Sequence, residues 1–236
     1  MAHLLLVRHG ESQTNAEGRW AGWRDVPLTD RGVEQARAAG QRLRDAGIPF
    51  SCVLTSMLQR AVKTADALLA ECGQEGFERR ADWRLNERHA GMMQGRTWPE
   101  VKAAYGRDRA RIYRRSWDQA PPPVPAGSED DPHTDARYAT CSGPLPRSEA
   151  MGDLARRVEP VWRDDIVPRL QAGENVLVVA HAMSLRVLAR PVEGMTEPGL
   201  PEWKMASAIP RCYALDRSLR PVHVTVLGDD EDATEE

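Results

Sequence analysis

The sequence has few lysines, few cysteines and no long apolar run. Its longest uninterrupted apolar stretches, Leu4–Val7 and Val176–Ala180, fall far short of the ~20 residues that a membrane-spanning helix needs. The chain enters a strand-like run directly, without the charged segment and long apolar segment of a secretory leader. We therefore expect a cytoplasmic protein that has no membrane partner.

Cysteine and charge exclude two further classes of protein. The four cysteines form no C-x-x-C pair, so neither a disulfide framework nor a zinc site is expected. The formal net charge of −3 argues against general binding to nucleic acid. Nearly all basic residues are arginine, the lysines being Lys63, Lys102 and Lys204. Arginine is the better bidentate phosphate ligand, but a GC-rich genome produces the same excess of arginine. Only the positions of the arginines can show whether they bind phosphate or reflect codon usage.

Strand-like and helix-like segments alternate along the chain. Strands are predicted at His3–Val7, Cys52–Thr55, Asn175–Ala180, Cys212–Leu215 and Val222–Leu227. A helix is predicted at Thr29–Ala46 with Gly47 as C-cap, and a second from a capping box at Ser56–Gln59 to about Ala70. A third is predicted from about Ser148 to Leu170, with interruptions at Pro160 and Pro168. A fourth follows His181, with Ser184 as its cap. This alternation favours an α/β fold with three layers: a mostly parallel sheet with helices on both faces.

One irregular region interrupts this pattern. Residues 120–146 are rich in Pro, Gly, Ser and Asp. A stretch of this length within a compact domain is usually a lid, a binding loop or a disordered segment. We interpret residues 1–228 as a single domain with a long lid or insertion at about 114–146, and residues 229–236 as an acidic, mobile tail.

Two histidines directly follow the two most apolar strands. His9 lies between Arg8 and Gly10, and His181 follows Ala180. Open α/β sheets bind ligands at the carboxyl ends of their strands, so both imidazoles could face one crevice. Either histidine alone could equally end its strand and cap it by hydrogen bonding. The pair, together with the neighbouring arginines, favours a catalytic site.

The segment Arg8-His9-Gly10-Glu11, followed by Asn15, resembles the opening signature of the histidine phosphatase superfamily. Further segments are similar, in the same order, to one branch of it, the 2,3-bisphosphoglycerate-dependent phosphoglycerate mutases. These segments are Gly22–Thr29, Thr55–Thr64, Trp83–His89 with Gln94-Gly95, Tyr113–Asp118 with Pro121–Pro123, His181–Arg186 and Tyr213–Asp216. The resemblance covers almost the whole chain and implies the mutase-like three-layer fold.

The resemblance also implies a mechanism. His9, as a neutral imidazole, would attack phosphorus and become a phosphohistidine. Arg8, Arg60 and His181 would hold the phosphoryl oxygens. Glu87 would move the proton of the hydroxyl that leaves or attacks, although a surface ion pair is an alternative role for this carboxylate.

Ten positions are implied to contact the substrate. They are Ser12, Asn15, Gly22, Arg88, Ala90, Trp98, Arg114, Arg115, Ala182 and Met183. The three arginines would bind the remote anionic end of the substrate by forked hydrogen bonds, while a solvated helix face is the alternative for Arg114-Arg115. The substrate would be a small phosphorylated acid, 2,3-bisphosphoglycerate would prime His9, no metal is expected, and the assembly would be a homodimer.

Several positions depart from the mutase pattern, and they cluster at the substrate pocket. The mutases usually carry a hydroxyl, a phenol, an ammonium and an amide where this chain has Ala21, Ala90, Trp98 and Met183. Each lost charge-assisted hydrogen bond would typically be worth ~1.5–3 kcal/mol. Trp98 and Met183 offer apolar surface instead, which suits a substrate with an apolar or planar part. We therefore predict a mutase-like scaffold directed at a related phosphorylated acid in a specialised pathway; ordinary sequence drift is the alternative.

Three functions fit these residues. The first is a mutase, in which the phosphohistidine returns its phosphoryl group to another hydroxyl of the bound molecule. The second is a phosphatase of the same superfamily, in which water accepts the phosphoryl group. A covering segment at 114–146 would exclude water and favour the mutase. The polar groups that are lost on the side of Ala90 and Trp98 favour a different acceptor of the phosphoryl group, such as water. The third, a catalytically inactive binding module, conflicts with the retention of the residues of the transfer site.

Overall fold

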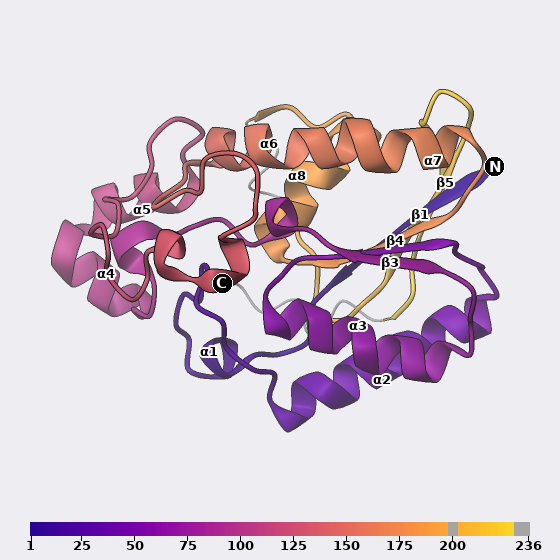
Figure 1. The fold of residues 1–236 in the computed structure, drawn as a ribbon, viewed down its shortest axis with the longest axis horizontal. Helices are drawn as coiled ribbons and strands as arrows, with labels where there is room; N and C mark the ends of the chain where they lie inside the picture. The colour runs from indigo at the N-terminus through magenta and orange to yellow at the C-terminus, as the bar shows by residue number, and fades with distance from the viewer. Residues whose placement is uncertain (198–202, 229–236) are drawn as a thin grey trace.

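The computed structural model describes residues 1–197 and 203–228, which form three layers around a six-stranded sheet (Figure 1). The strand order is β3-β2-β4-β1-β5-β6, in which β3, β2, β4 and β1 are parallel and β5 and β6 antiparallel. The strands are β1 (Ala2–Arg8), β2 (Cys52–Thr55), β3 (Glu78–Ala81), β4 (Val176–Ala180), β5 (Arg211–Leu215) and β6 (Pro221–Val226). The predicted three-layer, mostly parallel α/β fold is confirmed. The tail predicted at 229–236 lies outside the described residues.

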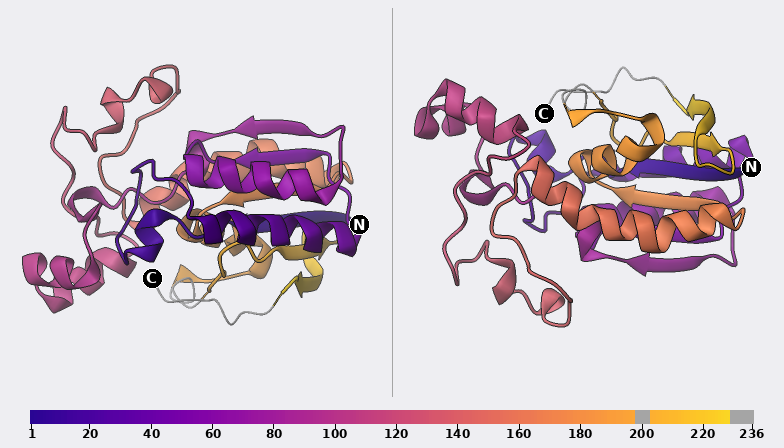
Figure 2. Two further views of the ribbon diagram at one scale, coloured as in Figure 1. Left: turned by 90° about the horizontal axis from the view of Figure 1, so that it is seen from below. Right: turned by 90° about the horizontal axis from the view of Figure 1, so that it is seen from above.

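Helices cover both faces of the sheet (Figures 1 and 2). One face carries α2 (Asp30–Ala46) and α3 (Gln59–Cys72); the other carries α6 (Met151–Pro160), the π-helical η5 (Val161–Ile166), α7 (Val167–Gln171) and α8 (Ala182–Glu193). Beyond the carboxyl ends of the parallel strands lie α4 (Trp98–Tyr105) and α5 (Arg107–Arg115). The short elements are α1 (Gln13–Ala16), η1 (Trp83–Leu85), η2 (Gly91–Met93), η3 (Pro132–Thr134) and η4 (Ala136–Tyr138).

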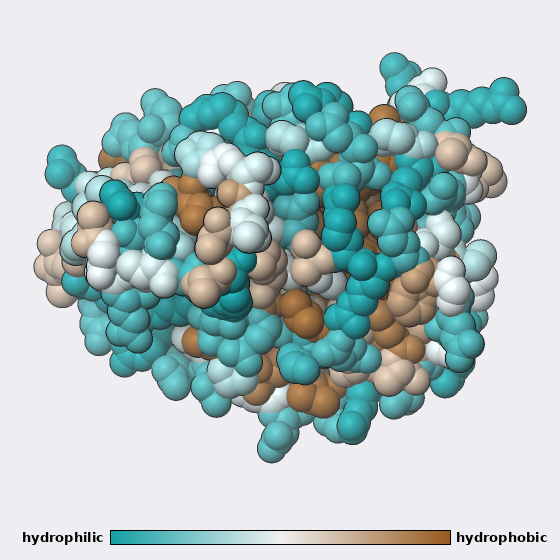
Figure 3. All heavy atoms as spheres, viewed as in Figure 1, coloured by the Kyte–Doolittle hydropathy of each residue, from teal (hydrophilic) through white to brown (hydrophobic). Residues whose placement is uncertain are grey.

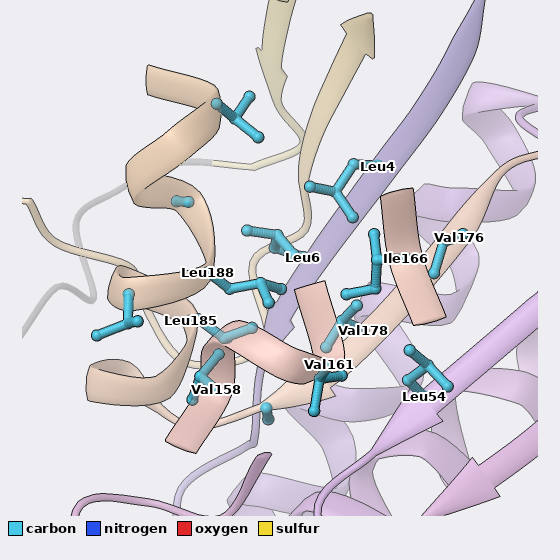
Figure 4. Close-up of a cluster of buried hydrophobic side chains, with 14 of the residues drawn as sticks. Leu4, Leu6, Leu54, Val158, Val161, Ile166, Val176, Val178, Leu185 and Leu188 are labelled. Atoms are coloured by element: carbon cyan, nitrogen blue, oxygen red, sulfur yellow. The ribbon is translucent and has the colours of Figure 1, made fainter. Parts of the chain in front are cut away.

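Alternate side chains of the central strands enter the two hydrophobic layers. In β1, Leu4 and Leu6 belong to the layer that also contains residues of α6, η5 and α8, and Figure 4 shows Leu6 beside Leu188. Leu5 and Val7 belong to the opposite layer with residues of α2 and α3. Because both faces are covered, the strands are continuous apolar runs rather than alternating ones. On the side seen in Figure 3 the surface is mostly hydrophilic, and its apolar side chains form small, separate patches.

The helix predicted behind the second strand begins differently from expectation. The capping box predicted at Ser56 is wrong, because α3 begins at Gln59 and has no side-chain cap at Leu58. The Gln59 amide instead donates to Asp25 Oδ1 at 2.6 Å, a residue distant in sequence. The Ser56 hydroxyl is thereby available for another partner, which lies in the site described below. By contrast, Gly47 ends α2 with a φ of +64°, as predicted, and Thr29, predicted as the first residue of this helix, is its N-cap.

The long helix predicted from about Ser148 begins at Met151. Ser148 Oγ donates to the carbonyl of Pro121 at 2.6 Å, and the first turn is closed by the Ala150 amide, which donates to Asp153 Oδ2. The predicted interruptions take the form of the π-helical segment η5, between the helix that ends at Pro160 and the one that contains Pro168. Proline lacks the amide hydrogen of a regular helical turn, and the wider π pattern accommodates that loss.

The segment predicted as a lid at about 114–146 is anchored beside the carboxyl end of the sheet. Tyr138 is 4% exposed and packs on Trp23, with ring centroids 5.1 Å apart. Asp130 forms an ion pair with Arg24 at 2.8 Å. Among residues 1–197 and 203–228, no helix is long and apolar enough to cross a membrane.

Candidate functional site

The sheet register brings the two strand-end histidines together. Arg8 at the end of β1 pairs with Ala180 at the end of β4, so the next residue of each strand is a histidine at the same level. The ring centroids of His9 and His181 are 5.0 Å apart, with the rings inclined at 60°. Both side chains are buried. The predicted juxtaposition of the two imidazoles is therefore observed.

The hydrogen bonds of His9 define its tautomer. Its Nδ1 lies 2.7 Å from the carbonyl oxygen of Gly10. Because a carbonyl oxygen can only accept, Nδ1 carries the hydrogen and Nε2 keeps its lone pair. Gly10 itself packs against the start of α2, where an added Cβ would come within 2.3 Å of the Gly32 carbonyl oxygen. Glycine at this position therefore allows His9 to follow the strand directly.

The surroundings of His9 keep its ring neutral. Burial is the largest effect that lowers its pKa well below the ordinary value, and the nearby guanidinium groups of Arg60 and Arg8 lower it further. The hydrogen bond to Gly10 acts weakly in the opposite sense. A neutral imidazole with a free Nε2 lone pair is the form that can attack phosphorus.

His181 is held in the complementary tautomer. Its Nε2 lies 2.7 Å from Ser56 Oγ, and that oxygen also accepts a hydrogen bond from the Leu58 amide. Among the described residues, Nε2 is the one acceptor within reach of the buried Ser56 hydroxyl hydrogen, so we assign this hydrogen bond as Ser56 Oγ donating to Nε2, which leaves the hydrogen of His181 on Nδ1. This buried Nδ1 has no hydrogen-bond partner among the described residues. Burial, Arg60 and His9, in that order, lower the pKa of His181, so it offers a neutral N–H donor.

Arg8 and Arg60 place two positive charges next to His9. Arg60, in the first turn of α3, is 1% exposed and donates to the carbonyls of Gly22 and Arg24 at 2.8 and 2.9 Å. Arg8 is 6% exposed and ends β1. Both line the same cavity as His9. Two buried guanidinium groups beside a nucleophile are suited to neutralising a transferring phosphoryl group.

Asn15 also lines this cavity, and Ser12 holds it in place. Asn15 Oδ1 accepts hydrogen bonds from the Ser12 amide at 3.1 Å and from Ser12 Oγ at 2.8 Å. Ser12 is fully buried and does not line the cavity. The structure thus places Ser12 as a support of Asn15.

The carboxylate of Glu87 projects from a segment that is clamped on two sides. The Glu87 carbonyl accepts from Trp23 Nε1 at 2.6 Å and from Arg157 Nη2 at 3.0 Å. Its Oε1 accepts from the Arg88 amide at 2.6 Å, and its Oε2 from the Met183 amide at 3.3 Å. Glu87 and Met183 both line the cavity. This geometry suits a proton carrier that must keep its position.

The cavity has a volume of about 410 Å³ and collects most of the predicted residues. Those that line it are Arg8, His9, Asn15, Gly22, Arg60, Glu87, Arg88, Ala90, Trp98, Arg114 and Met183. Among the other predicted residues, Ser12 and His181 are fully buried, and Ser12, His181, Ala182 and Arg115 are not part of the lining. Arg115 is exposed on α5.

Several residues of the site were not predicted, among them Ser56, Trp20 and Arg157. Ser56 directly follows a buried strand, as His9 and His181 do, and that position was the available signal. Trp20 lines the cavity and stacks on Trp98, with centroids 5.9 Å apart. Arg157 clamps the Glu87 segment from α6, and nothing in its local sequence distinguishes it from a surface arginine.

The arginines of the lining suit a polyanion. Within residues 1–197 and 203–228, no group of three or more His, Cys, Asp or Glu side chains is arranged to hold a metal. Arg8, Arg60, Arg88 and Arg114 all line the cavity, and guanidinium groups bind phosphate and carboxylate bidentately.

Comparison with known proteins agrees with this geometry. The family model of the histidine phosphatase superfamily (branch 1) matches residues 4–140 and 127–212. A 2,3-bisphosphoglycerate-dependent phosphoglycerate mutase of Thermobifida fusca is 42% identical over 94% of this chain and 90% of its own length. The 2,3-bisphosphoglycerate-dependent phosphoglycerate mutase 2 of Lactiplantibacillus plantarum is 39% identical over 97% of this chain and 100% of its own. The crystal structure of an α-ribazole phosphatase from Shigella flexneri superposes with a TM-score of 0.69, at 23% identity, over 99% of this chain and 100% of that one; at that identity the likeness concerns the fold alone.

Proposed function

Because the chain belongs to branch 1 of the histidine phosphatase superfamily, we propose that it transfers the phosphoryl group of a small phosphorylated acid through a phosphohistidine at His9. The observation that carries the proposal is the complementary state of two adjacent imidazoles. His9 presents a lone pair on Nε2, and His181 presents on Nδ1 an N–H that has no partner among residues 1–197 and 203–228. One is the form of a nucleophile and the other that of a donor to a phosphoryl oxygen.

The first half-reaction follows from these positions. His9 Nε2 attacks phosphorus, the bond between phosphorus and the substrate oxygen breaks, and Glu87 gives its proton to that oxygen. Arg8, Arg60, Asn15 and the Nδ1 hydrogen of His181 hold the phosphoryl oxygens, where charge must be neutralised throughout the transfer. In the second half, Glu87 takes a proton from the accepting hydroxyl, which attacks the phosphohistidine and regenerates neutral His9.

The accepting hydroxyl belongs to the bound acid in our proposal, which makes the chain a mutase. Two curated relatives that carry the name 2,3-bisphosphoglycerate-dependent phosphoglycerate mutase support this outcome, and support a bisphosphate as the donor that first phosphorylates His9. Arg88 and Arg114, which line the cavity, bind the remote anionic group of the acid, whereas the exposed Arg115 is not assigned to it. The proposal extends to a cytoplasmic homodimer, which the family resemblance implies.

A phosphatase is the second candidate, and one observation favours it. Ala21, Ala90 and Met183 line the cavity at positions where the mutases usually carry polar groups. After the phosphoryl group has moved to His9, an acid that is held by fewer hydrogen bonds leaves the cavity more readily. Water is then the remaining acceptor of the phosphoryl group.

Phosphorus NMR separates these outcomes. The protein is incubated with 3-phosphoglycerate, with and without a trace of 2,3-bisphosphoglycerate, and a His9→Ala variant serves as the control. Formation of 2-phosphoglycerate by the wild type alone supports a mutase that accepts phosphoglycerate, and inorganic phosphate alone supports the phosphatase. If neither forms, a phosphohistidine that appears with acetyl phosphate supports transfer to a different acid. A wild-type protein that takes phosphate from no donor contradicts the proposal.

A further inference from the structure

The cavity lining combines two kinds of chemistry. Arg8, His9 and Arg60 supply the phosphoryl end, and apolar side chains from separate parts of the chain supply another wall: Trp20, Ala21, Ala90, Trp98 and Met183. We propose, on the premise of the function proposed above, that these five residues form an apolar subsite. The substrate is then the phosphate monoester of a carboxylic acid that carries an apolar side group.

The aromatic part of this subsite is held in place by the main chain. The indole planes of Trp20 and Trp98 are nearly parallel, inclined at 5° with centroids 5.9 Å apart. The Trp20 amide donates to the Arg96 carbonyl at 3.0 Å, and the Gly95 amide donates to the Trp20 carbonyl at 2.7 Å. A capping box between Thr97 and Glu100 fixes the first turn of α4, which carries Trp98. A wall built in this way is preorganised, so a ligand that contacts it loses little free energy in ordering it.

Ala90 joins the two indoles to the interior. Trp20 and Trp98 pack against a small buried cluster that contains Ala90, Met93 and Val101. Because Ala90 lines the cavity and has only a methyl group, the space in front of it is left to a ligand. A cavity of about 410 Å³ lies in the range that encloses ligands with a sizeable apolar part.

Two cations flank the same wall. The guanidinium carbon of Arg88 lies 6.0 Å from the Trp20 ring centroid, and that of Arg114 lies 5.3 Å from the Trp98 centroid. Both residues line the cavity, and the buried Nε of Arg88 has no hydrogen-bond partner among the described residues. A carboxylate beside the apolar group would accept a hydrogen bond from this Nε and lie next to the charge of Arg114. The predicted ligand therefore carries a carboxylate, in addition to its phosphate, next to the apolar group.

A short polyhydroxylated acid fits this wall less well. Its hydroxyls would leave water to face indole and methyl groups, with no hydrogen bonds in return. An apolar side group instead removes both itself and the wall from water, which is favourable. The wall is thus expected to weaken the binding of a polyhydroxylated acid and to strengthen the binding of an acid with an apolar side group.

The test uses a matched pair of ligands that differ in one group. Calorimetry measures the binding of the O-phosphate esters of lactic acid and of 3-phenyllactic acid to a His9→Ala variant, which cannot consume them. The phenyl ester is expected to bind at least about tenfold more tightly. Trp98→Lys, made in the same variant, is expected to abolish most of this preference. Tyr105→Leu is the matched control, because Tyr105 packs on the same buried cluster but does not line the cavity.

Two results would overturn the subsite. One is equal or weaker binding of the phenyl ester, and the other is a preference that survives Trp98→Lys while Tyr105→Leu removes it. The premise is tested separately, by the phosphohistidine that wild-type protein forms with acetyl phosphate. The binding comparison decides the subsite whatever that second measurement gives, since it involves no chemical step.

Discussion

Ser56 Oγ lies 2.7 Å from Nε2 of His181, although the two residues follow different strands and are 125 positions apart in the sequence. Their contact follows from the register of β2 and β4, which pairs Thr55 with Val179. The serine hydroxyl donates to Nε2 and thereby keeps the His181 hydrogen on Nδ1. It is a positioning residue, which acts on the phosphoryl group through the imidazole.

Ser56→Ala is expected to lower kcat by roughly 10–100-fold with little change in KM, because a buried hydrogen bond worth about 1–3 kcal/mol is lost and the second tautomer becomes accessible. Ser56→Thr, which keeps the hydroxyl, should restore most of the rate. Steady-state kinetics at pH 7.5, where the lowered pKa keeps His181 neutral, measure both parameters. A Ser56→Thr variant that is as slow as Ser56→Ala would instead indicate a purely structural role of this side chain.

Buried His89 makes stability depend on pH. Burial lowers its pKa from 6.5 to about 4. The unfolded chain therefore takes up a proton near pH 6.5 that the folded chain refuses until about pH 4, so this contribution to stability is present above pH 6.5 and is lost as pH falls between these values. The difference corresponds to roughly 3 kcal/mol, and His9 and His181 act in the same direction.

Urea unfolding at pH 7.5, 6.5, 5.5 and 4.5 measures this effect. His89→Gln should flatten the dependence of the unfolding free energy on pH relative to the wild type. Curves of equal slope for wild type and His89→Gln would show that His89 titrates normally in the folded protein.

The parts of the fold that the sequence predicted are those with local causes. β1 and β4 were predictable because a strand covered on both faces is a continuous apolar run, and α2 because Thr29 and Gly47 cap it. The site was predictable where residues follow strand ends, as His9 and His181 do. The role of Ser56 could not be predicted, because a serine three residues before a glutamine fits a helix cap equally well. Only the register of β2 and β4 shows that Ser56 contacts His181 instead. The stacking of Trp20 on Trp98 likewise depends on hydrogen bonds between segments 75 or more residues apart.

Arg157 on α6 couples stability to the position of Glu87. Its guanidinium group forms a fork with Glu149, at 2.6 and 2.7 Å, and both side chains are almost fully buried. The same group donates to the carbonyls of Arg84, Asn86 and Glu87. Arg157→Met should lower the unfolding free energy by about 3–5 kcal/mol, because Glu149 is left as an unpaired buried charge.

Arg157→Met should also lower kcat, since the segment of Glu87 loses its clamp. The double variant Arg157→Met with Glu149→Gln removes the stranded charge, and it should regain part of the stability but none of the kcat. Denaturant unfolding and steady-state kinetics on both variants separate these effects. A double variant that recovers kcat together with stability would remove Arg157 from any role in positioning Glu87.

Tyr138 offers a test of the proposal that residues 114–146 form a lid. Its buried ring packs on Trp23, and its hydroxyl accepts a hydrogen bond from Asn86 Nδ2 at 2.9 Å, directly before Glu87. Tyr138→Ala removes both contacts and should loosen the segment, so trypsin should cleave at Arg137 at least about tenfold faster, as expected when local opening limits proteolysis. Tyr138→Phe keeps the ring and should resemble the wild type.

The same variant should change the fate of the phosphohistidine. Among the described residues of the proposed lid, only Arg114 lines the cavity. If the lid as a whole keeps water away from His9, loosening it should raise the rate at which the phosphohistidine hydrolyses. That rate is measured by following the decay of the phosphorylated protein after the donor is removed. Faster proteolysis with unchanged hydrolysis would mean that the segment is anchored by Tyr138 but does not shield His9. Faster hydrolysis in Tyr138→Ala, with Tyr138→Phe unaffected, would tie water exclusion to the packing of this one ring against Trp23.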